Sequence, residues 1–461
     1  MIVPATVALA GAAVLSGFFQ GEETQLAALA AVIIGVMTPC LWLVKAEASL
    51  DFFEFPVMLY GLLVVFFPLR LILAVLLGEE LFYLPPAALR LSLLACLTGF
   101  LAFAVGYRSK AGMRLAERFN PLISRFDGEW DVGRTNLLAL ALMIVSLISV
   151  YLVYSATGSL FYFLRLDPLT KNPYEIAYWY YYATWGIKCL AVGALFQAVI
   201  FLRYRQQPLL TAGYFLAAAL TAALVSRGTL IMLLLLVFGL FNYLRRKVGP
   251  VLLAWLGVLV LAWLVLGGML RYRASLAFTP TGVSDLLRLH VLQGLDHLPT
   301  LAIVMQNVPD VLPWQRGKTF LVLLYKPIPR SVMPDKPLGA SGILNSTLFP
   351  LSYEAGYAFS STIIGEWYLN FSWAGIILGM ALIGVAASMV WHLRAKSRSP
   401  GRVLIYLVCV FGLVSWVRND FQVATTDFFF LLLPTLAGVL FARRPERYRK
   451  RLLVGGGHFL I

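Results

Sequence analysis

The sequence predicts an all-α integral membrane protein that crosses the bilayer many times. Of its 461 residues, 60% are hydrophobic and 13% are charged, whereas a soluble domain carries about 25% charged residues. The mean hydropathy is +0.82. Apolar segments of membrane length recur along the chain. We expect residues 1–461 to form a single integral membrane domain with about twelve spans, at Ile2–Phe19, Gln25–Val44, Pro56–Leu77, Ala87–Val105, Thr135–Val153, Ile176–Leu202, Leu209–Val225, Thr229–Leu244, Pro250–Leu270, Trp373–Trp391, Val403–Val417 and Phe421–Phe441.

Clustered basic residues predict the orientation of these spans. The formal net charge of +15 resides in loop clusters, which is typical of cytoplasmic loops of membrane proteins and indicates no nucleic-acid partner. The clusters occupy residues 108–134, 203–205, 245–247, 394–402 and 443–451. With the amino terminus inside, all of them fall on the cytoplasmic side, so we expect both termini in the cytoplasm. The loop Lys45–Phe55 is the exception, because it is also predicted inside yet carries one lysine and three acids.

The longest loop, Arg271–Ser372, is predicted on the opposite, periplasmic face between the ninth and tenth spans. Loops beyond about 15 residues are usually functional or disordered. Within it, Leu324–Pro350 has four prolines at positions 327–337 together with several cations, which predicts a stiff, extended loop that is neither helix nor strand. Such a loop suits an anionic ligand; a connector with solvated charges is the alternative. Leucines at helical spacing predict an amphipathic helix over Val283–Leu298.

No motif for a metal, a nucleotide or a disulfide framework is present. The four cysteines lie far apart in apolar segments, as small core residues do. His290 and His297 are seven residues apart, which is not the i, i+4 spacing of a helical metal pair. We therefore expect no cofactor.

Three cations lie where a membrane charge needs a partner or a water-filled cavity. Arg227 lies in the turn Ser226–Gly228 and Arg418 in the turn Arg418–Asp420, each at the tip of a short apolar hairpin. Snorkelling to the interface is the alternative. Lys188 lies one to two turns deeper in its span than a cluster of tyrosines and tryptophans. That cluster predicts either an interfacial belt or a platform for sugar rings.

The second half of the chain resembles the oligosaccharide repeat-unit polymerases of the Wzy type. The resemblance rests on the late periplasmic loop, on the Pro-Ile-Pro-Arg…Pro-Asp-Lys-Pro run at 327–337, and on the sequence Gly-Glu-Trp-Tyr-Leu-Asn-Phe at Gly365–Phe371. The arginine turns at Arg227 and Arg418 also look like those of the family. A glycine often follows the Asn-Phe pair in the family, and Ser372 stands there in this chain.

The resemblance implies an enzyme of the inner membrane that joins undecaprenyl-pyrophosphate-linked oligosaccharides into O-antigen or a related polysaccharide. It implies a fold similar to the GT-C class, with membrane lipids and a chain-length regulator as further partners. A pyrophosphate leaving group needs cations, and guanidinium groups match phosphate oxygens. The expected phosphate-binding residues are Arg227, Arg271, Arg273, Arg330, Lys336 and Arg418, and the expected sugar-stacking residues are Tyr325, Trp367 and Tyr368.

The acceptor hydroxyl needs a base, for which Glu366 is the first candidate and Glu354 and His290 are the alternatives. Glu366 has a competing interpretation as a structural partner of the nearby cations. We expect a single metal-independent displacement at the anomeric carbon. Two other functions stay open: an O-antigen ligase, which would need a catalytic histidine in the large loop, and a non-catalytic lipid-linked oligosaccharide flippase, which would spread its cations along a central cavity.

Overall fold

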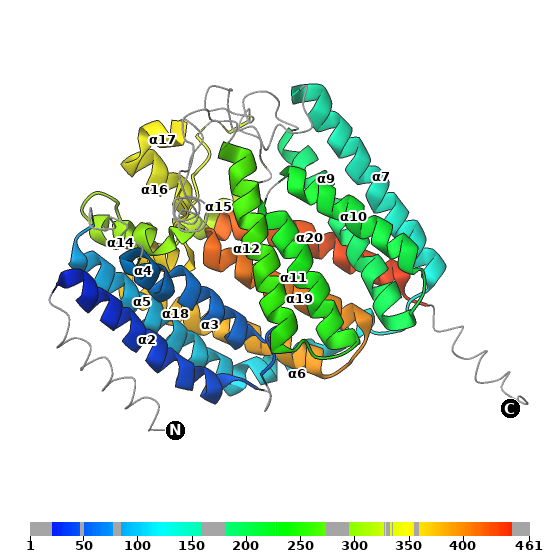
Figure 1. Ribbon diagram of the computed structural model, residues 1–461, viewed down its shortest axis with the longest axis horizontal. Coiled ribbons are helices and arrows are strands. Elements are labelled where there is room, and N and C mark those ends of the chain that lie inside the picture. Colours follow the sequence, from blue (N-terminus) through cyan, green and yellow to red (C-terminus); the bar gives the residue numbers. More distant parts are fainter. Residues whose placement is uncertain are drawn as a thin grey trace, which may run out of the picture.

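A computed structural model describes most of the chain as a bundle of helices (Figure 1). It describes residues 21–46, 50–76, 84–157, 180–225, 227–272, 295–326, 328, 332–333, 335–354 and 359–444. The regular elements there are α2 Glu22–Val44, α3 Phe55–Phe66, α4 Pro68–Leu76, α5 Pro86–Arg108, α6 Lys110–Ile123, η1 Ser124–Phe126, α7 Val132–Thr157, α9 Tyr180–Val199, η2 Ile200–Tyr204, α10 Pro208–Val225, α11 Arg227–Leu244, α12 Pro250–Tyr272, α14 His297–Asn307, α15 Lys318–Tyr325, α16 Ala340–Leu348, α17 Pro350–Glu354, α18 Ile363–Ala395, α19 Pro400–Arg418 and α20 Phe421–Ala442.

Eight helices in the described residues are long and apolar enough to cross a membrane. They cover Glu22–Val44, Phe55–Leu76, Pro86–Arg108, Val132–Ser155, Trp185–Tyr204, Ile363–Ala395, Pro400–Arg418 and Phe421–Ala442. Helices α10, α11 and α12 coincide with three further predicted spans, but their apolar stretches are shorter. Ile2–Phe19 lies outside the described residues. An all-helical membrane protein is therefore confirmed, whereas twelve spans and a GT-C-like fold stay predictions.

Helix α18 is the central element, packed along α5 and α6 and also against α14 and α19. Glycines allow α5 and α18 to approach closely: a Cβ added at Gly106 would lie 1.9 Å from the Ala381 carbonyl oxygen, and one at Gly384 would lie 2.2 Å from that of Phe103. Small residues let membrane helices approach closely, and the van der Waals packing gained in this way holds them together, since lipid supplies no hydrophobic force between helices. The close contact holds the middle of α18 against α5.

The helices form two groups in Figure 1, with α2, α3, α4 and α5 at one side and α7, α9 and α10 at the other. Helix α18 packs on α5 of the first group, α20 packs on α7 and α9 of the second, and α19 packs on both α18 and α20. The short helices α14, α15, α16 and α17 gather at one end of the molecule. Helix α14 packs on α5 and α18, and α15 packs on α20 and α18. The segments predicted as a late loop therefore cover one end of the membrane helices.

Helix α18 begins at Ile363, within the segment predicted as loop, and ten residues before the predicted span. Its first part ends in a break at Phe371 and Ser372, where the backbone leaves helical geometry. The extended conformation predicted for Leu324–Pro350 is wrong in part, because Ala340–Leu348 is helical. The prolines stop before this segment, and Gly339 is its N-cap, so no missing backbone N–H interrupts a helix there.

The acids between α2 and α3, which weakened the predicted orientation, are core residues. Asp51 is 1% exposed and Glu54 is 0% exposed. Asp51 accepts a hydrogen bond from Nδ2 of Asn242 at 3.1 Å and lies 3.8 Å from a guanidinium nitrogen of Arg394. Charges that are buried and paired inside the bundle do not act as loop charges, so the exception to the positive-inside pattern has a structural explanation.

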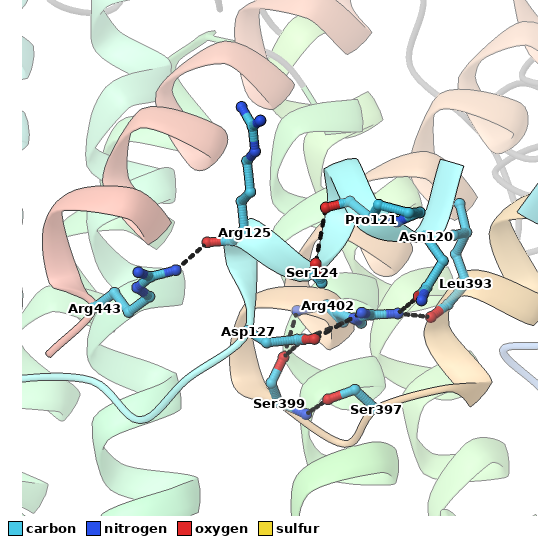
Figure 2. Close-up of polar contacts among 10 residues, drawn as sticks. All are labelled: Asn120, Pro121, Ser124, Arg125, Asp127, Leu393, Ser397, Ser399, Arg402 and Arg443. Atoms are coloured by element: carbon cyan, nitrogen blue, oxygen red, sulfur yellow. Dashed lines mark hydrogen bonds and ion pairs between the residues drawn. The ribbon is translucent and has the colours of Figure 1, made fainter. Parts of the chain in front are cut away.

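A second buried charge pair joins three segments at the end of α18 (Figure 2). The guanidinium of Arg402 donates to both oxygens of Asp127, from Nε at 2.7 Å and from Nη2 at 2.6 Å. Its Nη1 donates to Asn120 Oδ1 at 2.9 Å and to the Leu393 carbonyl oxygen at 2.8 Å. The Ser399 hydroxyl adds a third donor to Asp127 at 2.7 Å. The α6–α7 connection is thereby fastened to the α18–α19 turn.

Candidate functional site

A buried carboxylate lies at the amino-terminal end of α18. Glu366 is 0% exposed. The Thr319 hydroxyl of α15 donates to its Oε1 at 2.7 Å, and the backbone N–H of Phe421, the first residue of α20, donates to its Oε2. A buried polar group is stable only with such hydrogen bonds. Glu366 therefore connects three segments that are far apart in the sequence.

Asn370 extends this network by one helical turn. Its side-chain amide donates to the Thr319 hydroxyl at 2.8 Å, while its Oδ1 accepts from the backbone N–H of Gly317 at 2.7 Å. Both contacts hold the start of α15 against α18. Glu366 and Asn370 are four residues apart and so lie on one helix face. That spacing was visible in the sequence, but the roles of Thr319 and Asn370 were not predicted.

The turn between α19 and α20 is held to the same end by Asp420. This residue caps α20 by accepting from the Val423 N–H at 2.8 Å. Its other oxygen accepts from the Ser341 N–H, in the first turn of α16, at 3.1 Å. An aspartate directly before an apolar helix is a recognisable capping signal. The contact with α16, in contrast, depends on the fold.

An aromatic cluster lies beside Glu366. The Trp367 ring centroid is 4.6 Å from that of Phe320 and 6.3 Å from that of Trp416. The ring of Phe421 contacts Phe320 at 5.2 Å and Trp416 at 5.1 Å. Tyr368, on the adjacent face of α18, is 9% exposed. Trp367 therefore lies at the junction of α15, α18 and α19 and is only half-buried.

Arg418 is the last residue of α19, and it is exposed at this end. Beside it lies His297, whose ring stacks on Phe66 with centroids 4.1 Å apart. Burial and, to a smaller extent, the positive charge of Arg418 lower the pKa of His297 to about 3. His297 is therefore neutral at physiological pH. The preceding residue, Asp296, forms an ion pair with the buried Arg70 of α4 at 3.3 Å.

Part of this end of the molecule lies in a segment that matches a known protein family. Residues 339–445 match the model of the O-antigen polysaccharide polymerase Wzy family. No curated protein and no solved structure matches the chain. The matched segment contains α16 to α20 and with them Glu366, Asn370, Arg418 and Asp420. The Wzy resemblance predicted from the sequence is thus confirmed for this region.

One departure from the Wzy pattern has a structural counterpart. Ser372, which occupies the position where the family often has glycine, has φ 59° and ψ −150°. This region of backbone space is accessible essentially only to glycine without strain. The break in α18 therefore explains why a glycine would suit this position. It separates the first turns of α18, which carry Glu366, from the membrane-spanning remainder.

The other predicted site residues are placed as follows. Lys336 donates from Nζ to the carbonyl oxygens of Lys326 at 2.8 Å and Ile328 at 2.9 Å, so it stabilises the proline-rich segment. Tyr325 ends α15 and Glu354 ends α17, and both are exposed. Arg227 begins α11 and Arg271 lies in the last turn of α12, with side chains outside the described part. His290, Arg273 and Arg330 also lie outside it, as does most of the predicted helix Val283–Leu298.

Lys188, the lysine predicted to need a partner, has one in α20. Its Nζ is 3.0 Å from Asp427 Oδ1 and 4.0 Å from the centroid of the Trp185 ring. The ion pair and the cation–π contact together compensate the desolvation of an ammonium at membrane depth. This pair joins the Wzy-matched α20 to α9.

Proposed function

We propose that this protein polymerises lipid-linked oligosaccharide repeat units into O-antigen or a related surface polysaccharide. The observation that carries the proposal is the match of residues 339–445 to the Wzy family, over the segment that contains the buried Glu366 network and the Arg418 turn. The helical membrane architecture fits a lipid-linked substrate. The half-buried Trp367 offers an aromatic plane on which the C–H face of a sugar can stack.

The proposed substrates are undecaprenyl-pyrophosphate-linked oligosaccharides, one as donor and one as acceptor. Arg418 is the exposed last residue of α19, and its planar guanidinium suits two phosphate oxygens at once. Arg227, Arg271, Arg273 and Arg330 are proposed to complete the pyrophosphate site. Lys336 contributes through the loop that it holds together, since its ammonium already binds two carbonyl oxygens.

The proposed reaction is a single displacement. The acceptor hydroxyl oxygen attacks the anomeric carbon of the donor sugar, the bond from that carbon to the pyrophosphate oxygen breaks, and the pyrophosphate leaves with the electron pair. The hydroxyl proton passes to a base. Glu366 can be this base only if Thr319 or Phe421 releases its hydrogen bond, because both carboxylate oxygens already accept one. Glu354, exposed at the end of α17, is the alternative base.

We expect deletion of the gene to leave a single repeat unit on the lipid core. A ligase would instead leave no repeat at all, so the electrophoretic pattern of the surface polysaccharide separates the two activities. In the deletion strain, Arg418→Ala should restore polymer roughly tenfold to a hundredfold less well than the wild type, because a charge-assisted bond contributes about 1.5–3 kcal/mol. Arg418→Lys should rescue only in part.

The control for this experiment is Arg398→Ala, at an exposed position of the α18–α19 turn. It should restore polymer fully. If a folded Arg418→Ala variant made polymer of wild-type length, Arg418 would not be part of the pyrophosphate site. An unchanged polysaccharide pattern in the deletion strain would contradict the polymerase function.

The site end of the molecule is proposed to face the periplasm, with both termini in the cytoplasm. A cysteine at Asp310, exposed just after α14, should react with a membrane-impermeant thiol reagent in spheroplasts. A cysteine at Arg398 should react only after the membrane is permeabilised. The opposite labelling pattern would reverse the orientation. The natural cysteines lie at positions 40, 96, 189 and 409 and would be replaced beforehand.

A further inference from the structure

An apolar cavity of about 290 Å³ lies between α18, α19 and α20. Its walls come from Ile383 and Ala386 of α18, Cys409 and Gly412 of α19, and Ala424 and Phe428 of α20. All three helices are membrane spans by length and composition. Ala386 and Phe429 on its rim are exposed, so the cavity opens to the side of the bundle. We call it the lateral groove.

The lateral groove is continuous with the candidate site. Its outer end is formed by Trp416 and Phe421. Phe421 is the residue whose N–H binds Glu366, and Arg418 lies between these two aromatic residues in the chain. Every residue that lines the groove, apart from Phe55, belongs to the segment that matches the Wzy family. A groove that starts at a cationic turn and continues at membrane depth suits a lipid with an anionic head and a hydrocarbon tail.

The size and the lining of the groove fit a branched hydrocarbon chain. Along α20 it extends from Phe421 to Phe429, which is about 12 Å at the helical rise of 1.5 Å per residue. A glycine in its wall lets an aromatic lining residue pack directly on the backbone of α19. A Cβ at Gly412 would lie 2.7 Å from the Phe428 ring, so a larger side chain there would force that ring to move. Thr425 and Cys409 are the least apolar lining residues.

We propose that the lateral groove binds the first isoprenoid units of the polyprenyl chain of the lipid-linked substrate, with the pyrophosphate at the Arg418 end. This inference rests on the proposed function for the identity of the lipid. It assigns the tail of that lipid to α18, α19 and α20. The chain enters from the bilayer between Ala386 and Phe429, and so the lipid need not leave the membrane to react.

The test uses photoreactive lipids and the purified full-length protein in lipid nanodiscs. One probe is farnesyl diphosphate with a diazirine on its chain, and the other is palmitate with the same group. We expect the farnesyl diphosphate probe to label peptides from α18, α19 and α20, with competition by unlabelled farnesyl diphosphate. Ala386→Trp, which fills the groove, should reduce this labelling by roughly tenfold, equivalent to about 1.4 kcal/mol of binding.

The matched control is Leu382→Trp, because Leu382 lies on the same helix, is 64% exposed and does not line the groove. It should leave labelling unchanged. Ala386→Leu serves as a milder filling variant if the tryptophan prevents folding. Unchanged labelling in folded Ala386 variants, or equal labelling of the groove by the palmitate probe, would overturn the proposal. The experiment measures binding and not polymerisation. If the groove is labelled in a protein that proves not to polymerise, only the proposed function is refuted.

Discussion

Replacing Arg402 with alanine is expected to destabilise the protein by about 3–5 kcal/mol, since it leaves a partly buried carboxylate without its main partner. Arg402 is 4% exposed and holds both oxygens of Asp127, together with Asn120 and Leu393. Arg402→Lys should recover only part of the loss, because an ammonium cannot make the bidentate contact. The measurement is thermal unfolding of the purified protein in detergent.

The matched control is again Arg398→Ala, four residues earlier and exposed, which should change the unfolding temperature little. An Arg402→Ala variant as stable as this control would show that the pair contributes nothing. Burial alone would raise the pKa of Asp127, but the hydrogen bonds from Arg402 and Ser399 and the charge of Arg402 hold it below its usual value. A depressed carboxylate pKa gives stability that is complete at neutral pH and is lost only as the pH falls below about 4.

Replacing Glu366 with glutamine is expected to lower stability by about 1–3 kcal/mol and to reduce turnover of the folded protein only modestly. The amide can accept from the Phe421 N–H and donate to the Thr319 hydroxyl, but the Thr319 hydroxyl must then change from donor to acceptor within the network. Glu366→Ala should destabilise more, because it leaves two donors without an acceptor. Turnover is measured per folded molecule with lipid-linked repeat units, alongside the unfolding temperature.

This experiment separates the two roles of Glu366. If Glu366 is the base that accepts the proton of the acceptor hydroxyl, its loss should reduce turnover by about 10²–10⁴-fold. The unfolding temperature should then change little. That result would contradict the positioning role. Thr319→Val is the companion variant, because it removes one donor to Glu366 without changing the carboxylate. If Glu366 positions the site, both variants should lower the unfolding temperature in the same direction.

The helices were predictable because each depends on a local property of the sequence. A run of apolar residues long enough for the bilayer must satisfy its own backbone hydrogen bonds, and a helix does so within the segment. The predicted spans from Gln25–Val44 onward accordingly coincide with helices. The late start predicted for the tenth span shows the limit. Ile363–Asn370 contains Glu366 and Asn370, whose polarity suggested a loop, yet both side chains are satisfied by partners from α15 and α20.

Candidate residues were predictable to the extent that they share a short motif. Glu366, Trp367 and Tyr368 were found through one run of seven residues, and Arg418 through a charged turn between two apolar segments. Thr319, Asn370 and Asp420 were missed as site residues, because a threonine, an asparagine and a capping aspartate have many ordinary positions. Their importance comes from contacts over sequence separations of about 50 to 80 residues.

By itself, the sequence determined that this protein is a helical membrane protein that resembles the Wzy family toward its C-terminal end, because composition, apolar length and short motifs are properties of contiguous residues. Only the tertiary structure decided which charges are paired. It placed Asp51 and Glu54 in the core, Lys188 on Asp427, Asp127 on Arg402, and Glu366 between Thr319 and Phe421. The physical reason is that a buried charge selects its partner by proximity in space, and helix packing alone sets that proximity.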